Sequence, residues 1–109
     1  MIIKNTLICN KDFEFEKADI EIENGLIKKI GILDGEGEDF SGCTVLPGFI
    51  DIHIHGCNMA DATDGNPDSA ARMSRTLATH GITSFCPSTM TIPVDEFRNS
   101  FRYVAETMG

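Results

Sequence analysis

The segment that most constrains the fold is FIDIHIH, residues 49–55. Apolar and polar side chains alternate along it with a period of two, which is typical of a β-strand whose two faces have different surroundings. One face carries Ile50, Ile52 and Ile54, and the other carries Phe49, Asp51, His53 and His55. We therefore expect a strand that packs its isoleucines under helices and directs two imidazole rings to the same side.

The residues after this strand predict a helix, a second strand and a second helix. Asn66 is a favourable N-cap and Pro67 a favourable first helical residue, so we expect a helix that ends at Gly81. The β-branched and aromatic residues of ITSFCPST (82–89) predict a strand, and a further helix is expected from near Pro93. Its apolar stripe, which we interpret as core, consists of Val94, Phe97, Phe101, Val104 and Met108. This order predicts parallel strands with helices packed on them.

The first 46 residues predict strands only. MIIKNTLIC is apolar and β-branched, and ADIEIENG alternates isoleucine with glutamate. Asn24-Gly25 is a strong two-residue hairpin signal, after which LIKKIGIL predicts the return strand. The Gly- and acid-rich DGEGEDFSG predicts a loop before a short strand, CTVL. We expect an antiparallel sheet with one solvated face.

Composition excludes several classes of partner. The chain has 109 residues, 41% of them hydrophobic, and a net charge of −8. This balance is that of a small globular domain, and it argues against binding to nucleic acids or anionic membranes, which attract Lys/Arg clusters. The opening residues lack the pattern of a secretory signal, so we expect a cytoplasmic location. The four cysteines contain no C-x-x-C pair and are expected to be free thiols.

The histidine pair is the feature with the clearest chemistry. Residues i and i+2 of a strand project from the same face, so His53 and His55 can reach a common point. Neutral imidazole is the commonest metal ligand, and the pair precedes a polar loop, where functional groups of parallel α/β proteins collect. The alternative is that His-x-His arises by chance on a half-exposed strand. We expect Asp51 to orient its neighbours or to brace the floor of the barrel rather than bind metal, and His80 to complement the dipole at a helix end.

Several stretches resemble a known superfamily. VLPGFIDIHIHG resembles the first barrel strand of the amidohydrolases, which combine a (β/α)8 barrel with a β-sandwich, and ADIEIENGLIKKIG is similar to their sandwich hairpin. HGCNMADATDG and HGITSFCPSTMT are similar to the N-acetylglucosamine-6-phosphate deacetylases, one family within that superfamily. This family hydrolyses the acetamide of an amino sugar phosphate and yields glucosamine 6-phosphate and acetate.

The resemblance implies a site. His53 and His55 match the pair that binds one divalent metal ion in two-metal members, zinc or alternatively iron. The sequence departs from the family in having Cys57 and Met59 where relatives are often rich in glycine. The bridging carboxylate, two further histidines and the catalytic aspartate of the family lie on later strands, so no catalytic residue is expected in this chain.

The expected fold is mixed α/β. Residues 1–46 would form the N-terminal part of a β-sandwich, and residues 47–109 the first two βα units of a (β/α)8 barrel. A full barrel needs about 250 residues. We therefore expect the N-terminal portion of a deacetylase whose parent binds a sugar phosphate, inactive alone, that self-associates through its open edges.

Two alternatives remain. The parent is another amidohydrolase, such as a dihydroorotase-like or hydantoinase-like cyclic amidase, although SFCPSTMT speaks against it. Otherwise the chain is a non-catalytic module that binds metal or assembles with a partner. Activity on the acetylated sugar phosphate would separate the first alternative from the deacetylase.

Overall fold

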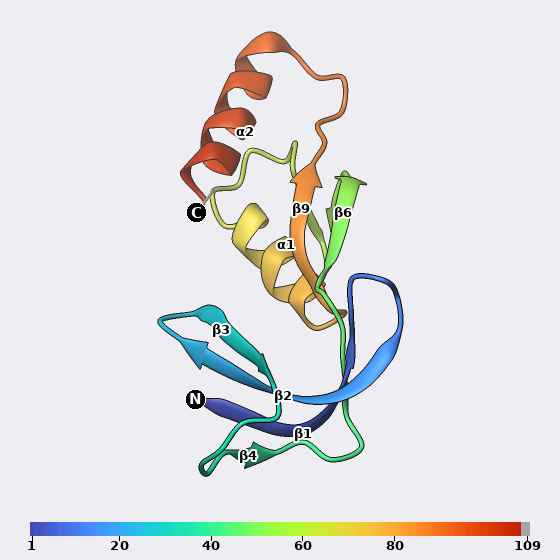
Figure 1. Ribbon diagram of the computed structural model, residues 1–109. Coiled ribbons are helices and arrows are strands. Elements are labelled where there is room, and N and C mark those ends of the chain that lie inside the picture. The colour runs from blue at the N-terminus through green and yellow to red at the C-terminus, as the bar shows by residue number, and fades with distance from the viewer. Residues whose placement is uncertain (108–109) are drawn as a thin grey trace. The chain divides into compact units, whose positions relative to one another are not determined.

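The computed structural model describes residues 1–107 (Figure 1). The chain divides into two compact units between Pro47 and Gly48. The first unit consists of strands: β1 (Ile2–Cys9), β2 (Phe15–Glu23), β3 (Leu26–Gly31), β4 (Glu38–Asp39) and β5 (Thr44–Val45). The second contains β6 (Phe49–Ile54), β7 (Gly56–Cys57), β8 (Ala60–Asp61), α1 (Ser69–Ala78), β9 (Ile82–Pro87) and α2 (Val94–Glu106). In residues 1–107, neither helix has the length and apolar character needed to cross a membrane.

The sheet of the first unit has the order β3-β2-β1-β4, with β5 also paired to β1. The predicted hairpin is present: Asn24 and Gly25 connect β2 to β3 with φ angles of +52° and +77°, the left-handed conformation that a tight two-residue turn requires. The prediction of a purely antiparallel sheet is wrong, because β4 and β5 run parallel to β1. After β3 the chain crosses to the free edge of β1 instead of turning back, which reverses the expected direction. The loop prediction for residues 34–42 also missed β4.

The core of this first unit is small. Ile8, Ala18 and Ile20 are buried, and Ile3, Ile22 and Val45 pack partly buried against them. The alternation in ADIEIENG therefore places its apolar side chains inward, as the period of two predicts.

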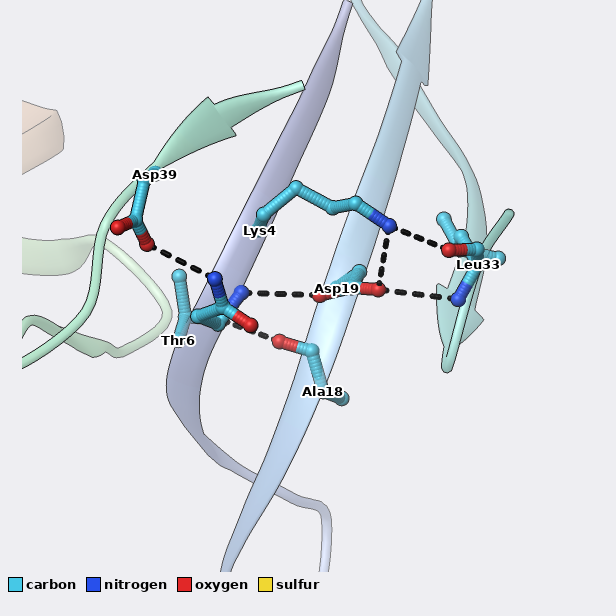
Figure 2. A network of polar contacts seen from close by, with 7 residues as sticks. Lys4, Thr6, Ala18, Asp19, Leu33 and Asp39 are labelled. Carbon is cyan, nitrogen blue, oxygen red and sulfur yellow. Dashed lines mark hydrogen bonds and ion pairs between the residues drawn. The ribbon is translucent and has the colours of Figure 1, made fainter. Parts of the chain in front are cut away.

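A buried carboxylate holds the crossing segment in place. Asp19 is 5% exposed and accepts hydrogen bonds from the backbone N–H of Asn5 at 2.9 Å and of Leu33 at 3.0 Å. Lys4 Nζ lies 3.2 Å from the same carboxylate and also donates to the Leu33 carbonyl. Figure 2 shows Asp19 between Lys4 and Leu33. The two backbone donors, with Lys4, hold the pKa of Asp19 below its ordinary value although burial opposes them.

This lowered pKa predicts a loss of stability in acid. The unfolded chain takes up the Asp19 proton more readily than the folded one, so the contribution is present above roughly pH 5 and is lost as the pH falls through 4 toward the folded pKa. We expect Asp19→Asn to lower the melting temperature by several degrees at pH 7 and to flatten this acid dependence. Melting curves between pH 3 and 7 measure both effects, with Asp34→Asn, a change at an exposed carboxylate, as the control. Equal acid dependence in the Asp19 variant and the wild type would contradict the assignment.

The second unit contains a β-α-β crossover. β6 and β9 pair in parallel, as the strand–helix–strand order predicts, and α1 connects them (Figure 1). α1 packs on β9 and on the β7–β8 hairpin through Ala70, Met73 and Leu77, which are all buried. β7 and β8 pair in antiparallel in the polar stretch after β6, where the sequence predicted only a loop.

Both helix starts lie close to the predicted positions. α2 begins at Val94, directly after Pro93. α1 begins at Ser69 rather than Pro67, and its N-cap residue, Asp68, makes no side-chain capping bond. Asn66 Oδ1 nevertheless accepts a hydrogen bond from the Asp68 N–H at 3.0 Å, so the predicted capping side chain orders a turn that precedes the helix.

The prediction that the apolar stripe of α2 is core is wrong for most of the described residues. Val94 is 65% exposed, Phe101 60% and Phe97 39%, and only Ser100 is fully buried on this helix. Ile50 and Ile52 on β6 are 66% and 79% exposed, so they do not pack under helices as expected. The periodicity identifies the apolar faces, but within residues 48–107 no element of the second unit covers them. Met108, the last residue of the predicted stripe, lies outside the described residues.

Candidate metal centre

The two histidines converge at the end of β6. Their Nε2 atoms lie 3.3 Å apart, and the rings meet edge to face with centroids 4.9 Å apart. The convergence predicted from the period of two is therefore observed. His53 is exposed and His55 half-buried, so solvent ions have access to the pair.

The separation of the two nitrogens suits a shared metal ion. Two imidazole nitrogens at about 2.0–2.1 Å from a tetrahedral zinc ion lie about 3.3–3.4 Å apart. The Nε2–Nε2 distance of 3.3 Å matches this value without any movement of the rings. The donor set also fits, because imidazole nitrogen suits zinc and iron.

Ser88 holds the far side of both rings. Its carbonyl oxygen lies 2.8 Å from His55 Nδ1, and its Oγ lies 3.2 Å from His53 Nδ1. Its N–H donates to the carbonyl of Ile54, the residue between the two histidines, at 2.8 Å. The sequence motifs did not indicate Ser88 as a site residue. The signal for it was its position directly after the strand that pairs in parallel with β6.

Asp51 contacts the strand backbone rather than an imidazole ring. Its Oδ1 accepts a hydrogen bond from the His53 N–H at 3.0 Å. Cys57 faces away from the pair, since its Sγ lies 3.9 Å from the Met73 carbonyl oxygen on α1. The candidate site thus consists of His53 and His55, supported by Ser88. Asp51 precedes the pair on the same strand.

The other polar candidates have local partners. His80 Nδ1 lies 3.0 Å from the Thr76 carbonyl at the C-terminal end of α1, where the helix-end role was predicted. Asp64 accepts from Ser69 Oγ at 2.6 Å and from the Asn66 N–H at 2.9 Å. Burial raises the pKa of Asp64, but these hydrogen bonds outweigh it, and the net shift is downward. Within residues 1–107 no group of three His, Cys, Asp or Glu side chains is placed to hold a metal ion.

Comparison with known proteins identifies the family. Residues 44–106 match the model of the amidohydrolase family, and this match covers both histidines and Ser88. The chain therefore belongs to the amidohydrolase family.

Its relatives within that family include two deacetylases. The chain is 37% identical over 89 residues to the N-acetylglucosamine-6-phosphate deacetylase of Vibrio furnissii, an alignment that covers 78% of this chain and 22% of the relative. It is 33% identical over 106 residues to the same enzyme of Lysinibacillus sphaericus, covering 94% and 27%. A dihydroorotase of Listeria welshimeri is 29% identical over 99 residues, covering 87% and 22%. The chain thus spans about a quarter of the length of the relatives it matches.

The fold of the chain is similar to solved structures of deacetylases of the same name. The N-acetylglucosamine-6-phosphate deacetylase of Thermotoga maritima superposes with a TM-score of 0.79 at 26% identity, covering 97% of this chain and 27% of that one. The Mycobacterium smegmatis enzyme, solved as a mutant in complex with N-acetyl-D-glucosamine-6-phosphate, gives a TM-score of 0.81 at 21% identity, covering 97% and 29%. The mixed α/β fold of this chain resembles the N-terminal region of these deacetylases.

Proposed function

We propose that the chain forms the N-terminal portion of an N-acetylglucosamine-6-phosphate deacetylase, which hydrolyses the N-acetyl group to give glucosamine 6-phosphate and acetate. The observation that carries the proposal is the convergence of His53 and His55 Nε2 at 3.3 Å in a chain of the amidohydrolase family. The substrate class is supported by the two deacetylase relatives and by the sugar-phosphate complex of the Mycobacterium smegmatis enzyme.

The residues that would hold the metal are His53 and His55, through Nε2. Zinc is the proposed ion, with iron as the alternative. When bound, the ion would polarise the acetamide carbonyl and lower the pKa of a coordinated water. The role of this chain is to keep both imidazoles aligned, with Asp51 bracing the strand through the His53 N–H. A catalytic zinc takes three protein ligands, so we propose that the remaining ligands and the proton-transfer group lie outside residues 1–107.

We also propose an architecture for the two units. Residues 1–46 would belong to a β-sandwich, and residues 47–109 would begin a (β/α)8 barrel with two βα units. The parallel β6-α1-β9 crossover followed by α2 supports the barrel, as does the superposition on the Thermotoga maritima enzyme. The uncovered apolar faces of α2 and β6 support it as well, because a barrel places further elements against such faces.

The cysteines, the net charge and the exposed apolar faces of the chain support a location and a set of partners. The four cysteines are free, which is typical of a reducing compartment such as the cytoplasm, and we propose that location. The net charge of −8 disfavours nucleic-acid and anionic-membrane partners. The uncovered apolar faces support self-association of the isolated chain.

One other amidohydrolase remains a candidate. The Listeria welshimeri dihydroorotase favours a cyclic amidase, although its identity is lower than that of both deacetylase relatives. A parent that released acetate from N-acetylglucosamine 6-phosphate, but did not open dihydroorotate, would exclude this alternative.

The metal site is tested on the chain itself. We expect zinc to bind to the wild type and to a His80→Ala control, and binding to be lost in a variant carrying both His53→Ala and His55→Ala. Calorimetric titration with zinc chloride measures the three affinities. Equal affinity in the wild type and the double variant would contradict the proposed site.

Activity is tested separately. We expect the 109-residue chain with zinc to release no more acetate from N-acetylglucosamine 6-phosphate than the double variant does, because two ligands do not complete a catalytic site. An enzymatic acetate assay measures the release. Zinc-dependent release well above the double variant would show that the chain completes its own site and would contradict the proposal of outside ligands.

A further inference from the structure

The contacts of Ser88 differ from those of an ordinary loop residue. Its three polar groups, the N–H, the carbonyl and the hydroxyl, each contact one of three consecutive residues at and just after the end of β6: Ile54, His55 and His53. Ser88, which directly follows β9, thus fixes the position of both imidazole rings at the end of β6. We propose that Ser88 is the positioning residue of the histidine pair, and that its hydroxyl acts as a donor or an acceptor according to whether the pair holds a metal ion.

The tautomer of His55 follows from its contact with Ser88. A carbonyl oxygen only accepts hydrogen bonds, so the His55 Nδ1 that lies 2.8 Å from it carries the proton. In the neutral ring, Nε2 then has a free lone pair, and it lies 3.3 Å from His53 Nε2. The backbone of Ser88, and not its side chain, sets this half of the site.

The tautomer of His53 follows in turn. Without metal, the Nε2–Nε2 contact of 3.3 Å needs one proton, and because His55 Nε2 has none, His53 Nε2 supplies it. His53 Nδ1 is then bare and accepts a hydrogen bond from the Ser88 hydroxyl, 3.2 Å away. When both Nε2 atoms bind a metal ion, the His53 proton must be on Nδ1, where the same oxygen can accept it. A hydroxyl serves both states by rotation, whereas a carbonyl or a methyl group does not.

This inference deepens the proposed metal site and rests on it for the metal-bound state. The metal-free state is independent of the proposal, because the ring tautomers exist whether or not zinc binds. Nitrogen-15 NMR of the imidazole rings reports each tautomer directly. In the metal-free wild type near pH 8 we expect His53 protonated at Nε2 and His55 protonated at Nδ1. The same tautomer in both rings would overturn the inference without any variant being made.

Variants then separate the hydroxyl from the backbone. We expect Ser88→Ala to change the His53 nitrogen signals, to leave those of His55 unchanged and to weaken zinc binding about tenfold, the lower end of the effect of removing a group that orients a metal-bound histidine. Ser88→Thr, which keeps the hydroxyl, should restore both the signals and the affinity to within about twofold of the wild type. Ser84→Ala, at an exposed serine of the same strand, serves as the matched control.

The NMR and zinc-binding results distinguish a failure of the positioning role of Ser88 from a failure of the proposed metal site. If the wild type does not bind zinc but shows the two expected tautomers, the metal site fails and the positioning role of Ser88 stands. If Ser88→Ala leaves both the His53 signals and the zinc affinity at wild-type values, the hydroxyl has no such role. Circular dichroism checks that each variant is folded. If Ser88→Ala does not fold, the role of the hydroxyl is decided by comparing the nitrogen-15 spectra of Ser88→Thr with those of the wild type.

Discussion

Replacement of Met73 by alanine is expected to lower the free energy of unfolding by about 2–5 kcal/mol, the usual cost of truncating a buried methionine. Met73 is 0% exposed and lies at the centre of the α1 face that packs on β9 and the β7–β8 hairpin. A domain is typically stable by about 5–15 kcal/mol, so this loss is a large fraction of the total.

Urea denaturation followed by circular dichroism at 222 nm measures this loss. Among the described residues both helices belong to the second unit, so the helical signal reports the unfolding of that unit. Met90→Ala is the control, since its side chain is 55% exposed and the change is expected to cost less than about 0.5 kcal/mol. Met73→Leu should lose less than about 1.5 kcal/mol because it keeps the volume. Similar midpoints for Met73→Ala and Met90→Ala would show that α1 does not depend on this contact.

The isolated chain is expected to self-associate through the uncovered apolar side of the second unit. Phe97 and Phe101 stack with centroids 5.7 Å apart on α2, and Val94 extends the same exposed face. Burying a phenylalanine contributes about 1.5–3 kcal/mol. We therefore expect Phe101→Lys to weaken association at least tenfold, which corresponds to about 1.4 kcal/mol.

Sedimentation velocity over a range of concentrations measures this association. The net charge of −8 repels like copies, so association should strengthen when salt reduces the Debye length to about 8 Å or less. Arg98→Lys, at a largely exposed position of the same helix that keeps its charge, is the control. A wild type that remains monomeric at all concentrations and melts cooperatively would show that these residues close their own core.

The sequence was informative where a pattern had a local cause. The hairpin at Asn24-Gly25 follows from two residues that tolerate positive φ, and the convergence of His53 and His55 from the period of a strand. The β7–β8 hairpin was missed because its turn places Asn58 and Met59 at φ angles of +51° and +57°. Methionine is an unusual residue for this conformation, so the sequence carried no turn signal there.

The remaining errors concern contacts between distant segments. Periodicity shows that Phe97 and Phe101 share an apolar face, but not whether another element covers it. Ser88 was missed for the same reason, because its role depends on the register between β9 and β6. The parallel direction of β4 and β5 depends on the path of the connection after β3, which a partly buried ion pair between Lys4 and Asp19 stabilises.

The central place of β1 in its sheet has a consequence for biosynthesis. β1 is translated before all three of its partners, β2, β4 and β5, yet it pairs on both edges. At about 5–20 residues per second, a ribosome needs roughly 2–7 s to proceed from Cys9 to Val45. During this interval at least one edge of the apolar stretch IIKNTLIC lacks a complete set of strands of its own sheet to pair with. The nascent chain is therefore a candidate for chaperone binding before its second unit has been translated.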